Sequence, residues 1–379
     1  MDRGTELPTS ADVVIAGGGF AGAATACMLA HQGVSDVVLL EAEGQFGEHA
    51  SGLNAAMARQ LSSDELTGEV LRRSVAIWTL RDGSWTDDLE FRNTGSLLLM
   101  GPGPSGDALR KAARAAADAG LDCREVKPGE AVAAVPVLEG AGFDTAIATG
   151  ADGVVDIHGL LWRYLRAARA GGTRLFASCP VEAVEVQGGR VAAVRTPRGR
   201  IACRILVDAA GSWANRLAAM AGLAPLPMKP FRRHLVTTSP LPWVAADWPF
   251  VWHVTGDWYF RPEVGGLLLS PCDQSEAEPG RAVRDPAALE LLAARLATGC
   301  PALAGVPIHR WWAGLRTITR DGRFAIGPDP RLDGFVWVAG LGGHGMTASA
   351  AVGEFAAARI AGAEGPAGWA QGLGVERLL

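Results

Sequence analysis

One arginine in the second half of the chain stands out as a group that could hold an acidic ligand. Arg316 ends the stretch Trp312–Arg316, in which a glycine precedes it by two positions. A planar guanidinium can hold a carboxylate through two parallel hydrogen bonds, so Arg316 is the first candidate for orienting an anionic substrate. The alternative is an internal ion pair of Arg316 with Asp321 or Glu263.

Two further candidates lie on sequence segments that read as strands. Tyr259 is one of only two tyrosines in the chain and stands between Trp258 and Phe260. Its phenol could bond a carboxylate, or the ring could equally be a core aromatic of a sheet. Arg233 is a weaker candidate for binding substrate, because the pair Arg232-Arg233 is also typical of a solvated strand edge.

A histidine in a glycine-rich turn is the fourth candidate. His344 lies between Gly343 and Gly345, after an apolar run that reads as a strand. It could line a substrate pocket or act as a general base, and we prefer the simple contact. A substrate oxidised at a hydroxyl group would need that base, whereas an amine would not.

The elements that must position these groups begin with a strand–turn–helix unit at the N-terminus. The apolar run 11–16 predicts a buried strand, Ala23–Gln32 has helical composition, and Val37–Leu40 predicts a second strand that ends at Glu41. The segment Gly17–Gly22 between the first strand and the helix fits GxGxxG. This order of elements is a strong indication of dinucleotide binding, although it does not separate FAD from NAD.

Each glycine of this turn, and the acid after the second strand, has a physical role. Gly17 permits the tight turn, Gly19 lets the backbone approach a pyrophosphate, and Gly22 lets the helix pack on the sheet. The helix N-terminus offers unpaired N–H groups to phosphates. Glu41 is placed to accept hydrogen bonds from ribose hydroxyls.

Two later segments extend this unit. The segment 204–214 reads as a strand that runs into a glycine turn, and 334–347 reads as a strand followed by a turn into a helix over about 348–361. A nucleotide-binding unit built from the beginning, middle and end of the chain resembles an FAD domain interrupted by a substrate domain.

These stretches resemble the D-amino acid oxidase superfamily of FAD enzymes, which includes glycine oxidase, sarcosine oxidase and D-arginine dehydrogenase. The resemblance covers nearly the whole chain and is not specific for one substrate. It rests on Val14–Gly22 with Glu41, His49–Ala56, Asn93–Leu98, Gly153–Asp156, Val207–Trp213, Trp258–Glu263, Gly314–Arg316 and Gly340–Thr347.

The resemblance implies a set of site residues. Arg316 matches the arginine that binds the substrate carboxylate in relatives, and Arg316, Tyr259, Arg233 and Met57 are expected to contact substrate. Met57 stands where D-arginine dehydrogenase has a histidine, which disfavours arginine-like substrates. FAD is expected to be bound noncovalently by Gly17, Gly19, Phe20, Ala21, Gly22, Glu41, His49, Ser51, Gly52, Ala55, Ala56, Val181, Ala210, Gly211, Trp213, Arg316, Gly342, Gly343, His344, Gly345, Met346 and Thr347.

The expected fold is α/β, with a Rossmann-like FAD-binding domain and an α+β substrate domain built on an antiparallel sheet. We assign residues 1–80, 145–228 and 313–379 to the FAD-binding domain and 81–144 and 229–312 to the substrate domain. Turns are expected at Gly83 and Asn93, and the segments before residue 11 and after Gly365 are expected to be loose.

Composition excludes several other classes. The formal net charge is −5, which argues against nucleic acid as a partner. The six cysteines form no CxxC pair and no metal-ligand cluster, as is typical of reduced thiols in a cytoplasmic protein. The apolar stretch 13–30 is rich in glycine and follows acidic residues, so we expect neither a signal peptide nor a transmembrane segment.

Three functions fit these observations. The first is oxidation of the C–N bond of an amino acid or secondary amine by hydride transfer to flavin, giving an imine that hydrolyses. The alternatives are a flavin-dependent hydroxy-acid dehydrogenase with His344 as base, and a flavin subunit of a larger electron-transfer complex. Sarcosine oxidase activates oxygen with a lysine in the strand that matches 265–270, and this chain has none there, which favours a dehydrogenase.

Overall fold

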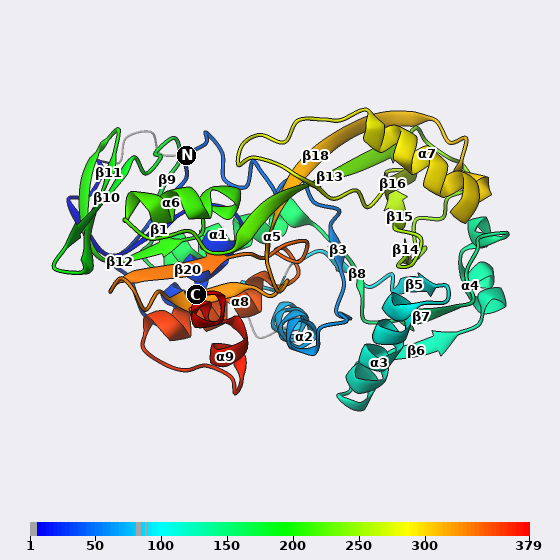
Figure 1. Ribbon diagram of the computed structural model, residues 1–379, viewed down its shortest axis with the longest axis horizontal. Helices are drawn as coiled ribbons and strands as arrows, with labels where there is room; N and C mark the ends of the chain where they lie inside the picture. Colours follow the sequence, from blue (N-terminus) through cyan, green and yellow to red (C-terminus); the bar gives the residue numbers. More distant parts are fainter. Residues whose placement is uncertain (1–5, 81–84, 88) are drawn as a thin grey trace.

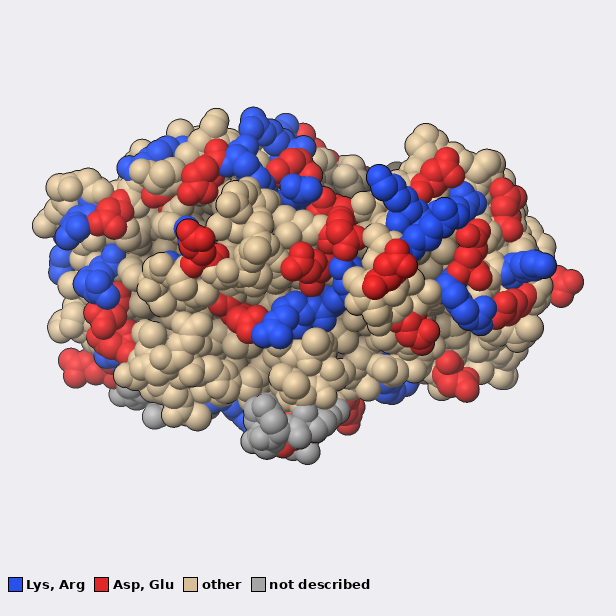
Figure 2. Space-filling model, turned by 90° about the horizontal axis from the view of Figure 1, so that it is seen from below, with Lys and Arg blue, Asp and Glu red and all other residues tan. Residues whose placement is uncertain are grey.

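The computed structural model describes residues 6–80, 85–87 and 89–379, and it contains two large sheets at opposite ends of the molecule (Figure 1). The predicted turn at Gly83 lies outside the described residues. In the described part of the chain, no helix is long and apolar enough to cross a membrane. Lys and Arg side chains alternate with Asp and Glu side chains over the face shown in Figure 2.

The first sheet has eight strands, and its centre is parallel. Its order is β10-β11-β12-β1-β2-β9, with β20 beside β12 and β19 beside β20. The pairs of β1 with β12 and β2, of β2 with β9, and of β12 with β20 are parallel. The strands are β1 Ser10–Ala16, β2 Val37–Leu40, β9 Arg174–Phe176, β10 Ala183–Gln187, β11 Arg190–Thr196, β12 Gly199–Asp208, β19 Ala325–Pro328 and β20 Phe335–Ala339.

Helices cover both faces of this sheet. On one face α1 (Phe20–His31), α2 (Glu65–Thr79), α5 (Ile157–Ala170) and α8 (Ser349–Ile360) share one apolar core, and on the other α6 (Ala214–Met220) packs. Helices α1 and α8 approach closely, because a Cβ added at Gly353 would lie 2.6 Å from a backbone atom of Ala24. This arrangement brings the N-terminal and C-terminal segments of the nucleotide-binding unit together, as predicted.

The second sheet has nine strands, and all its pairs are antiparallel except β5 with β14. Its order is β17-β13-β16-β15-β14-β5-β7-β6, with β18 beside β13. The strands are β5 Ser96–Met100, β6 Cys123–Val126, β7 Thr145–Thr149, β13 Met228–Thr238, β14 Phe250–His253, β15 Trp258–Glu263, β16 Gly266–Ser270, β17 Ser275–Glu276 and β18 Ile308–Thr319. Helices α3 (Pro104–Asp118), α4 (Pro128–Ala134) and α7 (Ala287–Gly299) lie beside it.

Shorter elements complete the described chain. A three-stranded sheet has the order β3-β8-β4, from β3 Met57–Ala58, β8 Gly153–Val155 and β4 Phe91–Arg92. The 3-10 turns are η1 Pro136–Leu138, η2 Gly211–Trp213, η3 Pro301–Leu303 and η4 Val375–Leu378. The α/β fold class is confirmed, with a Rossmann-like half and a half built on a largely antiparallel sheet.

Two details differ from the expectations. The segment after Gly365 is not loose, because it forms α9 (Trp369–Leu373) and η4, and Trp369 is buried and donates a hydrogen bond from Nε1 to Glu69. The expected domain boundary at residue 145 differs as well. Strand β7, which begins at residue 145 and was assigned to the FAD-binding domain, pairs with β5 and β6 in the nine-stranded sheet.

The long strands β13 and β18 connect the two halves and carry two of the candidate arginines (Figure 1). Arg233 lies opposite Gly314, so Arg233 and Arg316 occupy diagonal positions on one face of this antiparallel pair. Along β15, Tyr259 lies opposite Ser270 of β16 and opposite Trp252 of β14. The strand register therefore places these side chains on one face of the sheet.

Candidate active site

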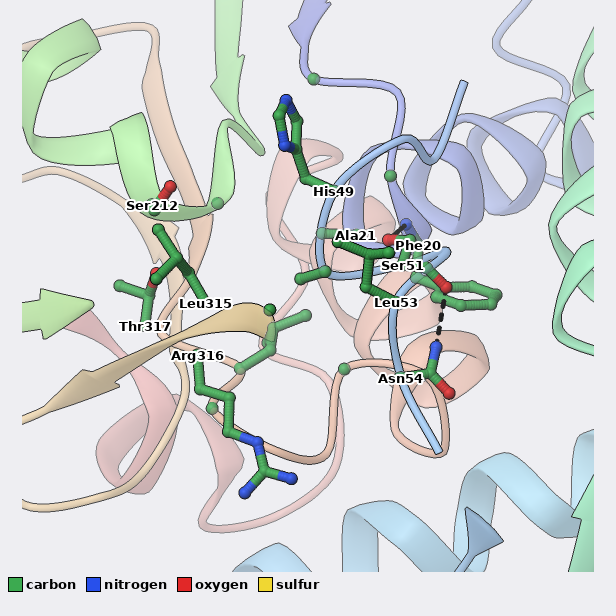
Figure 3. A pocket seen from close by; sticks show the side chains of 18 of the residues that line it. Phe20, Ala21, His49, Ser51, Leu53, Asn54, Ser212, Leu315, Arg316 and Thr317 are labelled. Carbon is green, nitrogen blue, oxygen red and sulfur yellow. Dashed lines mark hydrogen bonds between the residues drawn. The ribbon is translucent and has the colours of Figure 1, made fainter. Parts of the chain in front are cut away.

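A large cavity of about 850 Å³ lies between the two sheets. This is near the upper end of the range for small-molecule and cofactor sites. Its wall takes residues from the turn after β1, the loop 47–59, the segment after β12, strands β13, β15 and β18, and the turn 340–347. In Figure 3, Arg316 extends from β18 in the opposite direction to Leu315 and Thr317.

One end of the cavity is a glycine cradle around the start of α1. Gly17 has φ +113°, and a Cβ there would lie 2.3 Å from the carbonyl oxygen of Ala209. A Cβ at Gly19 would lie 2.8 Å from the hydroxyl oxygen of Ser51. Larger residues are excluded at these positions, so the backbone stays open to a close ligand.

The N-terminus of α1 faces this cradle. Its N-cap residue, Gly19, makes no side-chain capping bond, and the first turn carries no acidic residue. The Ser51 hydroxyl accepts a hydrogen bond from the backbone N–H of Phe20 at 2.9 Å (Figure 3). The helix dipole and the remaining N–H groups are thus available to an anion such as a pyrophosphate.

Glu41 is fixed at the end of β2. Its carboxylate accepts hydrogen bonds from the backbone N–H groups of Gly18 and Glu43, both at 2.8 Å. Burial raises the pKa of Glu41, although these bonds oppose the shift. The carboxylate therefore lines the cavity in one defined orientation, as a ribose ligand requires.

The loop that begins at His49 forms another wall. The His49 ring packs against Trp213 with centroids 4.7 Å apart, and its Nε2 lies 2.8 Å from the carboxylate of Glu43. Ala56 has φ +59°, and its N–H donates to the side chain of Asn54. The same loop reaches the cradle through Ser51 and the second sheet through Leu53, whose carbonyl oxygen accepts a hydrogen bond from Nε1 of Trp312. Noncovalent attachment of the flavin stays a prediction.

The other end of the cavity holds two arginines without an acidic partner. Among the described residues, Arg316 makes no hydrogen bond or ion pair that would neutralise it, and Asp321 pairs instead with Arg377 and Glu263 with Arg261. Burial and the charge of Arg233 lower the pKa of Arg316. The alternative of an internal ion pair for Arg316 is therefore not what the structure forms.

Arg233 and Tyr259 are deeply buried beside Arg316. Arg233 is 8% exposed, and its Nε and Nη1 atoms have no hydrogen-bond partner in the described part of the chain. The Tyr259 hydroxyl also lacks a partner among these residues, and burial raises its pKa. Unpaired buried donors are costly, so these atoms point to a ligand that satisfies them.

The sequence did not reveal a third arginine. Arg59 follows the loop and lies with its guanidinium 4.2 Å from the centroid of the Trp252 ring, and its Nη2 lies 3.0 Å from Nε2 of His344. Arginine can only donate, so His344 accepts through Nε2 and carries its proton on Nδ1. Burial and the charges of Arg59 and Arg316 lower the pKa of His344 to about 3.

The structure brings nearly all the predicted site residues to this cavity. Gly22 and Gly52 do not line the cavity, but both pack closely against backbone of its wall. A Cβ at Gly22 would lie 2.0 Å from the carbonyl oxygen of Gly17, and a Cβ at Gly52 would lie 2.6 Å from that of Gly47. Sequence reasoning missed several residues of the wall, notably Arg59, Leu53, Asn54, Trp252, Cys272, Leu315 and Thr317. The wall is therefore suited to bind a dinucleotide at the glycine cradle and an anion at the arginines.

Comparison with known proteins decides the family. Residues 12–359 match the family described as FAD dependent oxidoreductase. The chain belongs to this family. The predicted resemblance to the D-amino acid oxidase superfamily and the predicted FAD cofactor are thereby confirmed, and the glycine cradle, helix N-terminus and Glu41 are the residues of this chain that fit FAD.

The chain is similar to relatives of different length and different described function. The chain is 27% identical over 335 residues to the sarcosine oxidase subunit beta of Rhizobium meliloti (strain 1021), covering 84% of this chain and 77% of the relative. It is 24% identical over 366 residues to the mitochondrial pyruvate dehydrogenase phosphatase regulatory subunit of Mus musculus, covering 93% of this chain and 41% of the relative. The chain thus spans less than half the length of this curated relative.

A solved structure agrees over most of the chain. The crystal structure of L-proline dehydrogenase from P. horikoshii superposes with a TM-score of 0.85 and 26% identity, covering 93% of this chain and 94% of the other. The FAD dependent oxidoreductase family therefore accounts for both sheets and not only for the nucleotide-binding half.

Proposed function

We propose that this family member oxidises the C–N bond of a carboxylate-bearing amine, either an amino acid or a secondary amine. When bound, the flavin supplies the acceptor for the hydride that leaves the carbon next to nitrogen. The imine product then hydrolyses in water. The observation that carries the proposal is the guanidinium of Arg316, which faces the cavity without an acidic partner among the described residues.

Arg316, Arg233 and Tyr259 would hold the substrate carboxylate. They lie on one face of the sheet, and Tyr259 is close enough for the charges of both arginines to act on its pKa. Two guanidinium groups and a phenol can satisfy a carboxylate from several directions, which fixes the substrate in one orientation.

The same positive charge favours the reactive form of the amine. The nitrogen must lose its proton so that its lone pair can assist departure of the hydride. Neighbouring cations lower the pKa of a bound ammonium group, because they disfavour a second positive charge nearby. Positive charge that the bound carboxylate does not cancel therefore favours the neutral amine without a dedicated base.

The geometry of His344 argues against oxidation of a hydroxy acid. That reaction needs a base for the hydroxyl proton. The Nε2 lone pair of His344 already accepts from Arg59, and its pKa of about 3 makes it a weak base. We therefore place His344 in the wall as a positioning contact for Arg59.

A second candidate is a flavin subunit that works inside a larger assembly. One relative is a subunit of sarcosine oxidase and another is a regulatory subunit, and this chain covers only 41% of the latter. Size-exclusion chromatography of the isolated protein with activity measured on the peak distinguishes the cases. An active peak at the monomer or homo-oligomer mass contradicts the assembly.

We favour a dehydrogenase over an oxidase and a cytoplasmic location. Strand β16 carries three leucines and no lysine, which favours a dehydrogenase. The six cysteines are unpaired, which suits a reducing compartment. Faster reoxidation of the reduced protein by an artificial acceptor dye than by oxygen is the expected result. Equal or faster reoxidation by oxygen would make it an oxidase.

The substrate carboxylate gives the sharpest test of the proposal. Each candidate amine is compared anaerobically with its decarboxylated partner, for example sarcosine with dimethylamine and alanine with ethylamine, and bleaching of the oxidised flavin is recorded. We expect reduction by one or more carboxylated amines and none by their partners. Equal reduction by both members of a pair would remove the role assigned to Arg316.

A further inference from the structure

Three guanidinium groups converge on the end of the cavity that lies against the second sheet. Arg59, Arg233 and Arg316 all line it, and the charge of Arg316 acts on the pKa of Arg59 while that of Arg233 acts on Arg316. Burial lowers the pKa of Arg59 to about 10, so it remains charged at neutral pH. Arg316 lies between the other two in this electrostatic chain.

Nearby acidic groups compensate little of this charge. Asp152 acts on Arg59 but its carboxylate accepts from Ser96 and the backbone of Gln60. Asp273 bonds the ring and the backbone N–H of His234. Among the described residues no carboxylate lies within ion-pair distance of the three cavity arginines. Asp152 and Asp273 therefore offset part of the charge of these arginines from a distance, without bonding to any of the three.

The hydrogen-bond donors at this end of the cavity form two separate clusters. The first comprises Arg233, Arg316 and Tyr259 on the sheet face. The second is Arg59, held over Trp252 and against His344. Arg59 has five N–H donors and the contact with His344 engages one of its nitrogens, so donors remain for an anion.

One carboxylate does not satisfy both clusters. A carboxylate has two oxygens with about four acceptor positions, and it carries one charge. Arg233 alone presents two buried donor atoms without a partner, and Arg316 presents its whole guanidinium. The first cluster therefore uses one carboxylate fully, and the remaining N–H donors of Arg59 line the cavity without an acceptor among the described residues.

We propose that the substrate carries a second carboxylate, which Arg59 binds, so that the preferred substrates are amines with two carboxylates. This inference rests on the proposed function, in which Arg316 holds the carboxylate next to the reacting carbon. Two chemical sources fit equally: a secondary amine that bridges two carboxylates, and an amino acid with an acidic side chain. The reaction is unchanged, with hydride leaving the carbon next to nitrogen and the imine taking up water.

Binding of unreactive acids tests the second subsite without turnover. Succinate and malonate are titrated into the FAD-loaded protein against propionate and acetate, and dissociation constants are read from the flavin absorbance spectrum. A charge-assisted hydrogen bond contributes about 1.5–3 kcal/mol, so we expect the dicarboxylates to bind roughly 10- to 100-fold more tightly. Equal affinities for the two classes would overturn the inference.

Arg59 variants assign the preference to the residue. In Arg59→Met the preference for dicarboxylates should disappear while monocarboxylate affinity changes less than about 3-fold, and Arg59→Lys should restore part of it. Arg166→Met, an exposed arginine of α5, is the matched control and should keep the preference. An Arg59→Met protein that binds FAD and retains the full preference would contradict the assignment. If Arg59→Met does not fold, Arg59→Lys serves as the test. Loss of most of its preference for dicarboxylates would then support the assignment, and full retention of that preference would contradict it.

Reduction kinetics separate the two sources and the two hypotheses. Iminodiacetate is compared with sarcosine, and aspartate and glutamate with alanine, in anaerobic flavin reduction. Higher kcat/KM for a dicarboxylate in either pair supports the inference and names the source. Faster reduction by the monocarboxylate in both pairs overturns it but leaves the proposed function standing. Failure of all carboxylated amines to reduce the flavin sinks the proposed function instead.

Discussion

Replacing Arg316 by methionine should damage the reaction and stabilise the protein at the same time. The side chain keeps its length and apolar stem but loses the guanidinium. Two charge-assisted hydrogen bonds at about 1.5–3 kcal/mol each amount to about 3–6 kcal/mol, or roughly a 100- to 10,000-fold loss in kcat/KM for a carboxylated amine. FAD content should stay unchanged.

The stability change follows from the free site. Arg316 is half-buried at the cavity wall without an acidic partner among the described residues, and it is repelled by Arg233. Removing this charge should raise the free energy of unfolding of the substrate-free protein by about 1–2 kcal/mol, which shifts Tm upward by a few degrees. Structural arginines show the opposite sign, because their loss leaves an acid unpaired.

The assay combines anaerobic stopped-flow reduction with thermal unfolding of the FAD-loaded protein. Arg310→Met is the matched control, since Arg310 lies on the same strand β18 and is exposed. It should change neither kcat/KM nor Tm appreciably. A fall in Tm together with loss of FAD in Arg316→Met would show that Arg316 supports the fold or the cofactor and would refute the reasoning.

Two further predictions concern the nucleotide-binding half. Gly17→Ala places a Cβ 2.3 Å from the Ala209 carbonyl oxygen at φ +113°, so the purified protein should lose most of its FAD, read from the visible-to-ultraviolet absorbance ratio, whereas Gly129→Ala in open space should keep it. Burial raises the pKa of Asp208 well above its usual range, and its Oδ2 has no partner among the described residues. The native state therefore holds the proton longer than the unfolded chain, and stability falls as pH rises from about 4 through the native pKa, by about 1.4 kcal/mol per pH unit. Asp208→Asn should remove this loss of stability, so the variant should gain more in Tm at pH 8 than at pH 5. The control Asp333→Asn, at an exposed position, should show no such difference. An equal gain of Asp208→Asn at both pH values would contradict the assignment.

Local patterns predicted the elements of the fold well. Helix α2 carries such a local signal, because Asp64 precedes it and accepts a hydrogen bond from the N–H of Thr67. The signals for such an element lie within a few residues of one another, because capping and apolar periodicity are local. The glycine turn after β1 was predictable for the same reason.

Contacts between distant segments were not predictable in this way. Arg59 reads as an ordinary charge after a loop, and its partners Trp252 and His344 come from β14 and from the C-terminal turn. The tail after Gly365 was expected to be loose, yet Trp369 is buried and donates a hydrogen bond to Glu69 of α2. The register that sets Trp252 of β14 opposite Tyr259 of β15 likewise became visible only in the structure.

Anaerobic reduction of the bound flavin by defined pools of compounds tests the central claim most directly. The purified, FAD-loaded protein is mixed with pools of D-amino acids, L-amino acids, N-alkylated amino acids and 2-hydroxy acids, and the visible absorbance of the oxidised flavin is followed. The free guanidinium of Arg316 and the weakly basic His344 predict bleaching by an amine pool and none by the hydroxy acids. Bleaching by hydroxy acids alone would contradict the account.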